Sequence, residues 1–160
     1  MIKVGTSGFS FPDWKGTIYP ANIKEGEMLP FYEKELGFNV LEVNFTYYTL
    51  PSQKSFEGMS RKTSKDFEFV VKAFKGMTHE IREKETRKLI DNHETFEKFK
   101  YGLVPLREEG KLTAVLAQFP YGFFPNREEV ASTDSSKRKS GRGGRPLLWS
   151  PWWRSRRSWI

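Results

Sequence analysis

The stretch NVLEVNFTYYTLPSQKSFEGMSRKTSKDFEFVVKAF, residues 39–74, has the pattern of a strand, a helix and a second strand. Its apolar runs NVLEVNF (39–45) and FEFVVKAF (67–74) are short and rich in β-branched and aromatic residues, as expected of strands. Between them, SQKSFEGMSRKT (52–63) predicts a helix with Ser52 as its N-cap. A strand, a helix and a strand in this order are typical of a parallel sheet.

The same alternation extends on both sides of this stretch. We predict further strands at IKVGTSG (2–8) and KLTAVLAQFP (111–120), and helices at MLPFYEKELG (28–37) and over a charged stretch from about 83 to 109. Pro105 is expected to break or end the last turns of the charged helix. The near-continuous apolar runs favour parallel strands buried on both faces. We therefore predict an α/β domain over residues 1–130.

The composition changes after residue 130. Residues 1–130 hold 19 basic and 19 acidic side chains, whereas residues 131–160 hold eight basic ones against Asp134, so the net charge of +7 belongs to the tail. The tail also carries four of the five tryptophans. We predict an irregular, basic, disordered tail at 131–160, or the product of a reading-frame shift near Ala131.

The composition argues against disulfides, most metal sites, signal peptides and membrane spans. The chain has no cysteine, which excludes disulfides and thiolate zinc sites, and with only His79 and His93 as imidazoles the usual transition-metal sites are hard to build. A magnesium or manganese site of carboxylates and water stays open, and no cofactor is assigned. The sequence has neither a signal-peptide pattern nor 18 consecutive apolar residues, so we expect a cytoplasmic protein without membrane contact.

Small and polar residues recur where the predicted strands end. In a parallel α/β sheet, ligands bind beyond the carboxyl ends of the strands. The residues concerned are Ser7 and Gly8 on the first strand, Glu42 and Asn44 on the second, Lys72 on the third and Gln118 on the fourth. Alternation along a strand places Glu42 and Asn44 on one face, and we expect both to line the mouth of a closed barrel.

Three of the polar residues are candidate catalytic groups: Glu42, Lys72 and His79. Lys72 beside a carboxylate can act as a base, an electrophile or a clamp for an anion, and the sequence leaves these roles open. A purely structural ion pair between Glu42 and Lys72 is the alternative. His79, in GMTHE (76–80), fits a general acid or base in a loop, and equally a solvated or capping histidine.

The candidate ligand-binding residues are Ser7, Gly8, Asn44, Tyr47 and Gln118. Tyr47 and its neighbour Tyr48 fit either stacking on a ligand or packing against a helix. Gly8 allows the backbone to approach a ligand closely. The surrounding stretch GTSGFSFPDWKGTIYP (5–20) lacks the Walker and dinucleotide-binding patterns, and its crowded aromatic residues fit a plug on the loop side of a barrel equally well.

Four ordered motifs resemble those of the YecE-like family, domain of unknown function number seventy-two. They are GTSGFSFPDWKGTIYP, LPFYEKELGFNVLEVNFTYYTLP, FEFVVKAFKGMTHE and VLAQFP, and the similarity covers about residues 1–125. The resemblance implies a TIM-type barrel of unestablished function. The positions that match recurring polar residues of the family are Ser7, Glu42, Asn44, Tyr47, Lys72, His79 and Gln118. Such barrels need roughly 250 residues, so we predict the first half, about four strand–helix units, of a (β/α)8 barrel.

Three functional hypotheses follow. The first is an enzyme-like barrel that binds or transforms a small polar or phosphorylated ligand, with Glu42 and Lys72 as its charged groups. The alternative is nucleic-acid binding, in which the basic residues of 131–160 meet phosphates and the tail's tryptophans stack on bases. The third is a truncated, inactive barrel whose open sheet edges and apolar inner face favour self-association.

Overall fold

The structure, a computed structural model, describes residues 2–83, 85, 86 and 88–120. These residues belong to the first of two compact units, Met1–Phe123. The predictions for the tail at 131–160, including its two proposed origins and its contacts with nucleic acid, lie outside the described residues.

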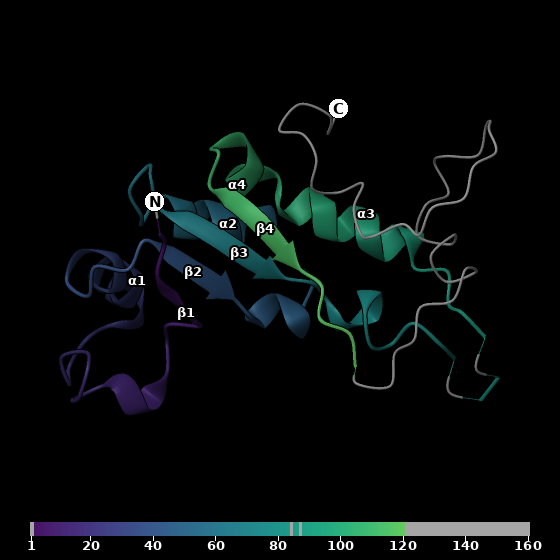
Figure 1. Ribbon diagram of the computed structural model, residues 1–160, viewed down its shortest axis with the longest axis horizontal. Coiled ribbons are helices and arrows are strands. Elements are labelled where there is room, and N and C mark those ends of the chain that lie inside the picture. Colours follow the sequence, from purple (N-terminus) through teal and green to yellow (C-terminus); the bar gives the residue numbers. More distant parts are fainter. Residues whose placement is uncertain (1, 84, 87, 121–160) are drawn as a thin grey trace. The chain divides into compact units, whose positions relative to one another are not determined.

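The four predicted strands form one parallel sheet. They are β1 (Gly5–Ser7), β2 (Val40–Val43), β3 (Glu68–Lys72) and β4 (Leu112–Leu116), hydrogen-bonded in the order β1-β2-β3-β4. Figure 1 shows the arrows of β2, β3 and β4 pointing in the same direction. The predicted α/β architecture is therefore confirmed, and closure into a barrel stays a prediction. The first strand starts later than predicted: Val4 N–H donates to the Asn39 side chain at 3.0 Å, while the Val4 carbonyl accepts from Asn39 N–H at 3.3 Å.

Helices follow the strands along the chain. They are α1 (Glu25–Lys34), α2 (Gln53–Ser60), α3 (His93–Gly102) and α4 (Val104–Glu108), with short 3-10 turns η1 (Pro12–Trp14), η2 (Phe45–Tyr47) and η3 (Lys75–Met77). The predicted N-cap of α2 is confirmed, since Ser52 Oγ accepts a hydrogen bond from Ser55 N–H at 3.3 Å.

The helix predicted over 83–109 is wrong in its first ten residues. Around this segment the backbone pairs antiparallel with itself: Ile90 N–H donates to Ile81 C=O, and Glu83 N–H to Lys88 C=O, both at 2.9 Å. The helix begins at His93, whose N–H donates to Asp91 Oδ1 at 3.1 Å. Pro105 lies in the first turn of α4, where its missing N–H breaks no helical hydrogen bond.

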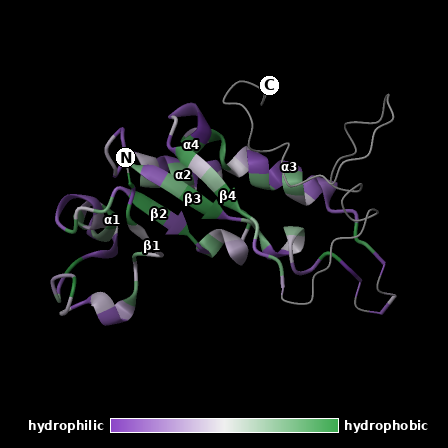
Figure 2. Cartoon of the chain, in the orientation of Figure 1, coloured by the Kyte–Doolittle hydropathy of each residue, from purple (hydrophilic) through white to green (hydrophobic). Residues whose placement is uncertain are grey.

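The main core lies between the sheet and the helices. Burial alternates along β2 and β3: Leu41, Val43, Phe69 and Val71 are fully buried, whereas Glu42, Val70 and Lys72 on the other face are only partly covered. The buried face packs against Tyr32 of α1, Phe56 of α2 and Phe99 of α3, among others. In Figure 2 the strands are mostly hydrophobic while α3 is largely hydrophilic. The face shared by Glu42 and Lys72 is thus the one turned away from the helices.

The aromatic residues of 5–20 pack beside α1. Tyr19, Ile23 and Met28 form a second buried cluster, and Phe9 and Trp14 lie against it. Phe9, Trp14 and Tyr19 of this stretch therefore have a packing role, and a plug on the loop side of a barrel stays a prediction. Gly5 permits the close approach of β1 to β2, because a Cβ there would lie 1.8 Å from the Val40 carbonyl oxygen.

The outer strands of the four-stranded sheet are β1 and β4. Val115 and Leu116 on β4 and Val4 just before β1 are exposed. Exposed apolar residues on outer strands favour pairing with another chain, and self-association through these edges stays a prediction. Among the described residues, no helix has the length and apolar character needed to cross a membrane.

We expect Ser52→Ala to lower the free energy of unfolding by about 1 kcal/mol, because it removes the side-chain acceptor at the N-terminus of α2. Urea denaturation followed by far-ultraviolet circular dichroism measures the change. Ser55→Ala is the matched control, since it removes the hydroxyl that lies 2.8 Å from Ser52 Oγ but leaves the capping oxygen and the Ser55 N–H in place. Equal urea midpoints for Ser52→Ala and the wild type would show that the Ser52 cap does not stabilise the folded protein.

Candidate functional site

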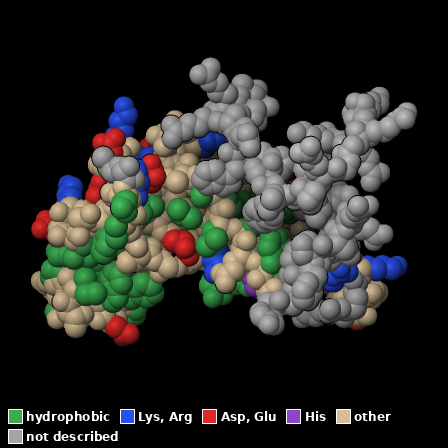
Figure 3. Space-filling model, in the orientation of Figure 1, with side chains coloured by type: hydrophobic (Ala, Val, Ile, Leu, Met, Phe, Trp, Pro, Cys, Tyr) green, Lys and Arg blue, Asp and Glu red, His purple; other side chains and the backbone are tan. Residues whose placement is uncertain are grey.

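A hollow of about 420 Å³ lies at the carboxyl ends of the four strands. Its lining residues are Ser7, Asn44, Tyr47, Tyr48, Lys72, His79 and Gln118, and we call it the strand-end hollow. Except for Tyr48, these residues are among those proposed as site residues from the sequence. Figure 3 shows acidic, basic and histidine surface side by side near these strand ends. Glu42 and Gly8 do not line the hollow, but Glu42 is hydrogen-bonded by Ser7, which does, and Gly8 follows Ser7 in the chain.

Ser7, Glu42 and Asn44 form a hydrogen-bonded chain across β1 and β2. Ser7 Oγ donates to Glu42 Oε1 at 2.7 Å, and Asn44 Nδ2 donates to Ser7 Oγ, also at 2.7 Å. Because an ionised carboxylate only accepts, the serine proton points to Glu42 and the asparagine must turn its NH2 group to the serine. Asn44 Oδ1 is then left buried, without a hydrogen-bond partner in the described part of the chain.

Lys72 and His79 meet at the ring of Tyr47. Lys72 Nζ lies 5.2 Å from the centre of this ring, within the range of a cation–π contact. The His79 ring packs edge-on against Tyr47 with centroids 5.2 Å apart, and Tyr48 does so at 5.0 Å. Tyr47 therefore contacts both a cation and an imidazole that line the hollow.

Glu42 and Lys72 do not form the ion pair proposed as the structural alternative. Among the described residues, the recorded ion pairs join other partners, and Glu42 is instead hydrogen-bonded by Ser7. The neighbouring Lys75 pairs with Glu80 at 2.9 Å, and this hydrogen-bonded contact raises the pKa of Lys75. The cation that lines the hollow is Lys72.

Two side chains position the site residues, and the sequence analysis missed both. Thr46 is fully buried, and its hydroxyl donates to the Lys72 carbonyl at 2.6 Å, which ties η2 to the end of β3. Thr78 Oγ1 lies 2.9 Å from His79 Nδ1. Both threonines are next to a proposed site residue in the sequence, but their partners became visible only in the structure.

Gly8 shapes the turn that follows β1. Its φ of +91° lies in the region that favours glycine, and a Cβ there would lie 2.8 Å from the Phe11 ring. Its N–H donates to the Glu42 carbonyl at 3.0 Å. Gly8 thus acts on the backbone beside Ser7 and Glu42.

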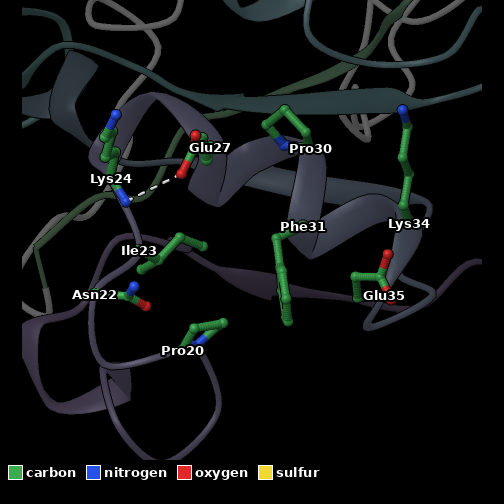
Figure 4. Close-up of a pocket in the computed structure, with 9 residues that line it drawn as sticks. All are labelled: Pro20, Asn22, Ile23, Lys24, Glu27, Pro30, Phe31, Lys34 and Glu35. Carbon is green, nitrogen blue, oxygen red and sulfur yellow. Dashed lines mark hydrogen bonds between the residues drawn. The ribbon is translucent and has the colours of Figure 1, made fainter.

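A second hollow, of about 450 Å³, lies between residues 20–24 and α1. Figure 4 shows Pro20, Ile23, Pro30 and Phe31 there, with Lys24 N–H bonded to Glu27. None of the proposed site residues lines it. Over the described residues, no group of three His, Cys, Asp or Glu side chains is arranged to hold a metal ion.

Comparison with known families identifies the chain. The model of the family described as protein of unknown function DUF72 matches residues 3–139. The chain belongs to the DUF72 family. The resemblance to the YecE-like family seen in the sequence motifs is thereby confirmed.

Other DUF72 proteins are about twice as long. The UPF0759 protein YunF of Bacillus subtilis is 30% identical over 141 residues, which cover 88% of this chain and 48% of YunF. A DUF72 crystal structure from Thermotoga maritima is 44% identical with a TM-score of 0.69, over 83% of this chain and 51% of that one. A DUF72 protein of Enterococcus faecalis, 25% identical, gives a TM-score of 0.63 over 83% and 45% of the two chains. This chain thus spans about half the length of these DUF72 relatives.

Proposed function

We propose that the chain forms part of a TIM-type barrel that binds a small polar anion, such as a phosphorylated compound, in the strand-end hollow. The observation that carries the proposal is the convergence of polar side chains from the ends of all four parallel strands on one hollow. The closed barrel is supported by the parallel strand order and by relatives of about twice the length.

The two sides of the hollow suit different parts of a ligand. On the β3 side, Lys72 provides a positive charge and His79 a polar ring, which suit an oxyanion. On the β2 side, Ser7 and Asn44 line the hollow, and their hydroxyl and amide groups suit a ligand hydroxyl. A hydroxylated anion satisfies both sides.

The same arrangement supports acid–base chemistry on such a ligand. Glu42 accepts a hydrogen bond from the Ser7 hydroxyl. Ser7 Oγ can therefore take a proton from a ligand while its own proton moves to the Glu42 carboxylate. Lys72 would stabilise negative charge that develops on the ligand. Because this chain spans about half of its relatives, we propose turnover for proteins with the whole barrel and ligand binding for this chain.

We expect inorganic phosphate, at about ten times its Kd, to raise Tm by about 5 °C, because this excess adds about 1.4 kcal/mol to the stability of the native state. Lys72→Met should reduce the rise to about 1 °C or less, since the charge in the hollow is lost. Thermal melts in phosphate and in potassium chloride of equal ionic strength measure the difference.

Lys75→Met is the matched control for this experiment. It removes the same charge three residues away from Lys72, but Lys75 pairs with Glu80 and does not line the hollow. The control should retain the phosphate-dependent rise. If Lys72→Met and Lys75→Met respond to phosphate like the wild type, the anion does not bind at Lys72 and the proposal fails.

A further inference from the structure

Thr78 and His79 form a hydrogen-bonded pair beside the strand-end hollow. Thr78 follows η3 and is 2 % exposed, and its Oγ1 lies 2.9 Å from Nδ1 of His79. His79 lines the hollow, whereas Thr78 does not. The Nδ1 edge of the imidazole is therefore engaged by the protein, and Nε2 is the ring nitrogen left to meet a ligand.

The direction of this hydrogen bond follows from the burial of Thr78. The only recorded partner of the Thr78 hydroxyl among the described residues is His79 Nδ1. If Nδ1 carried the proton, the imidazole would donate to Thr78, and the buried O–H would be left without an acceptor. If Nδ1 accepts, the hydroxyl is satisfied and the imidazole proton resides on Nε2.

We propose that Thr78 is a positioning residue that selects the His79 tautomer with its proton on Nε2, so that His79 donates a hydrogen bond to an oxyanion in the hollow. The assignment of the proton stands on the Thr78 contact, and the oxyanion rests on the proposed function. Tyr47 restrains the ring further, since the two rings pack edge-on at 88°. Two constraints thus fix the direction of the Nε2–H group before any ligand binds.

The substrate class follows from the donors gathered around Tyr47. Lys72 Nζ and the His79 ring both lie 5.2 Å from the Tyr47 ring centre. An ammonium and an N–H donor on one ring can contact two oxygens of the same phosphate or carboxylate. The positive charge of Lys72 favours an anionic ligand over a neutral one here.

Nuclear magnetic resonance of the imidazole nitrogens tests the proton assignment. The full chain is labelled with 15N in a His93→Gln background, which leaves His79 as its single imidazole because the sequence contains two histidines. At a pH where imidazoles are neutral, we expect a protonated Nε2 and an unprotonated Nδ1. Thr78→Val should yield a mixture of tautomers, whereas Thr78→Ser should retain the wild-type pattern. A proton on Nδ1 in the wild type, or an unchanged pattern in Thr78→Val, would overturn the inference.

Phosphate titration tests the use of this donor. If Thr78→Val lowers the fraction of His79 that can donate to about one half, the apparent Kd for phosphate rises about twofold. His79→Gln, whose amide nitrogen can lie near the position of Nε2, should retain more affinity than His79→Leu. Equal affinities of the Gln and Leu variants would overturn the donor role. A protonated Nε2 in a protein that binds no phosphate would support the tautomer and overturn the proposed function.

Discussion

Lys111→Met is expected to lower the free energy of unfolding by about 3 kcal/mol. Lys111 precedes β4 and is only 4% exposed. Its Nζ donates to the Ser60 carbonyl at 2.7 Å and to the carbonyl and hydroxyl of Thr63 at 3.1 and 3.2 Å. These oxygens lie at the C-terminus of α2 and just beyond it, where carbonyls have no helical partner. Methionine would remove the recorded partner of the Thr63 carbonyl, whereas the Ser60 carbonyl would keep its hydrogen bonds from Thr63 N–H and Oγ1.

Glu109 adds a weaker ion pair to this arrangement, since its Oε2 lies 3.8 Å from Lys111 Nζ and its side chain is nearly half exposed. The control is Lys62→Met, which removes the same charge from an exposed position just beyond α2. Urea denaturation followed by circular dichroism should show a large loss for Lys111→Met and a small one for Lys62→Met. Similar losses in both variants would mean that Lys111 contributes only through net charge.

Tyr32→Phe is expected to cost about 2 to 3 kcal/mol, because one hydroxyl joins two strands. Tyr32 is fully buried, and its oxygen accepts from Thr6 N–H at 2.7 Å and donates to the Val40 carbonyl at 3.1 Å. Gly8 N–H bonds the Glu42 carbonyl across the two parallel strands. Thr6 and Val40 each lie two residues earlier, so Thr6 N–H and Val40 C=O face each other in the same ladder. The hydroxyl of α1 thus bonds backbone groups of both β1 and β2, and phenylalanine would remove both of these hydrogen bonds.

Tyr19→Phe is the matched control for Tyr32→Phe, since both remove a hydroxyl from a buried tyrosine. Tyr19 makes one recorded hydrogen bond, to the Phe9 carbonyl at 2.8 Å, so about 1 kcal/mol is expected. Burial, with a smaller contribution from Tyr32, raises the pKa of Tyr19 to about 12. If chemical denaturation shows the same loss of unfolding free energy for both variants, the two hydrogen bonds of the Tyr32 hydroxyl stabilise the protein no more than the single one of Tyr19.

Local sequence patterns predicted most of the elements because their causes are local. Alternating burial along 40–43 and 68–72, and a serine before α2, depend on neighbours within a few residues. The helix prediction failed over the described residues of 83–92 for a related reason. Charged residues permit a helix, but the hydrogen bonds from Ile90 N–H to Ile81 C=O and from His93 N–H to Asp91 Oδ1 favour another conformation.

In the site, too, the positions of residues could be predicted from local sequence, whereas their hydrogen-bond partners could not. Position at a strand end was sufficient to select Ser7, Asn44, Lys72 and Gln118, because parallel strands bring their carboxyl ends to one edge of the sheet. It was not sufficient to identify partners, since Glu42 could pair with Lys72 or with another group. Parallel register places Ser7 beside Glu42, and the serine takes the place of the lysine.

The sequence by itself determined the α/β alternation, the family and the residues at the strand ends, because these depend on periodicity and on motifs within short segments. Only the tertiary structure decided that Ser7 bonds Asn44 across 37 positions, that the Tyr32 hydroxyl joins β1 to β2, and that Lys111 caps α2. The physical reason is that hydrogen bonds between distant side chains depend on register and burial, which exist only after the strands and helices have packed.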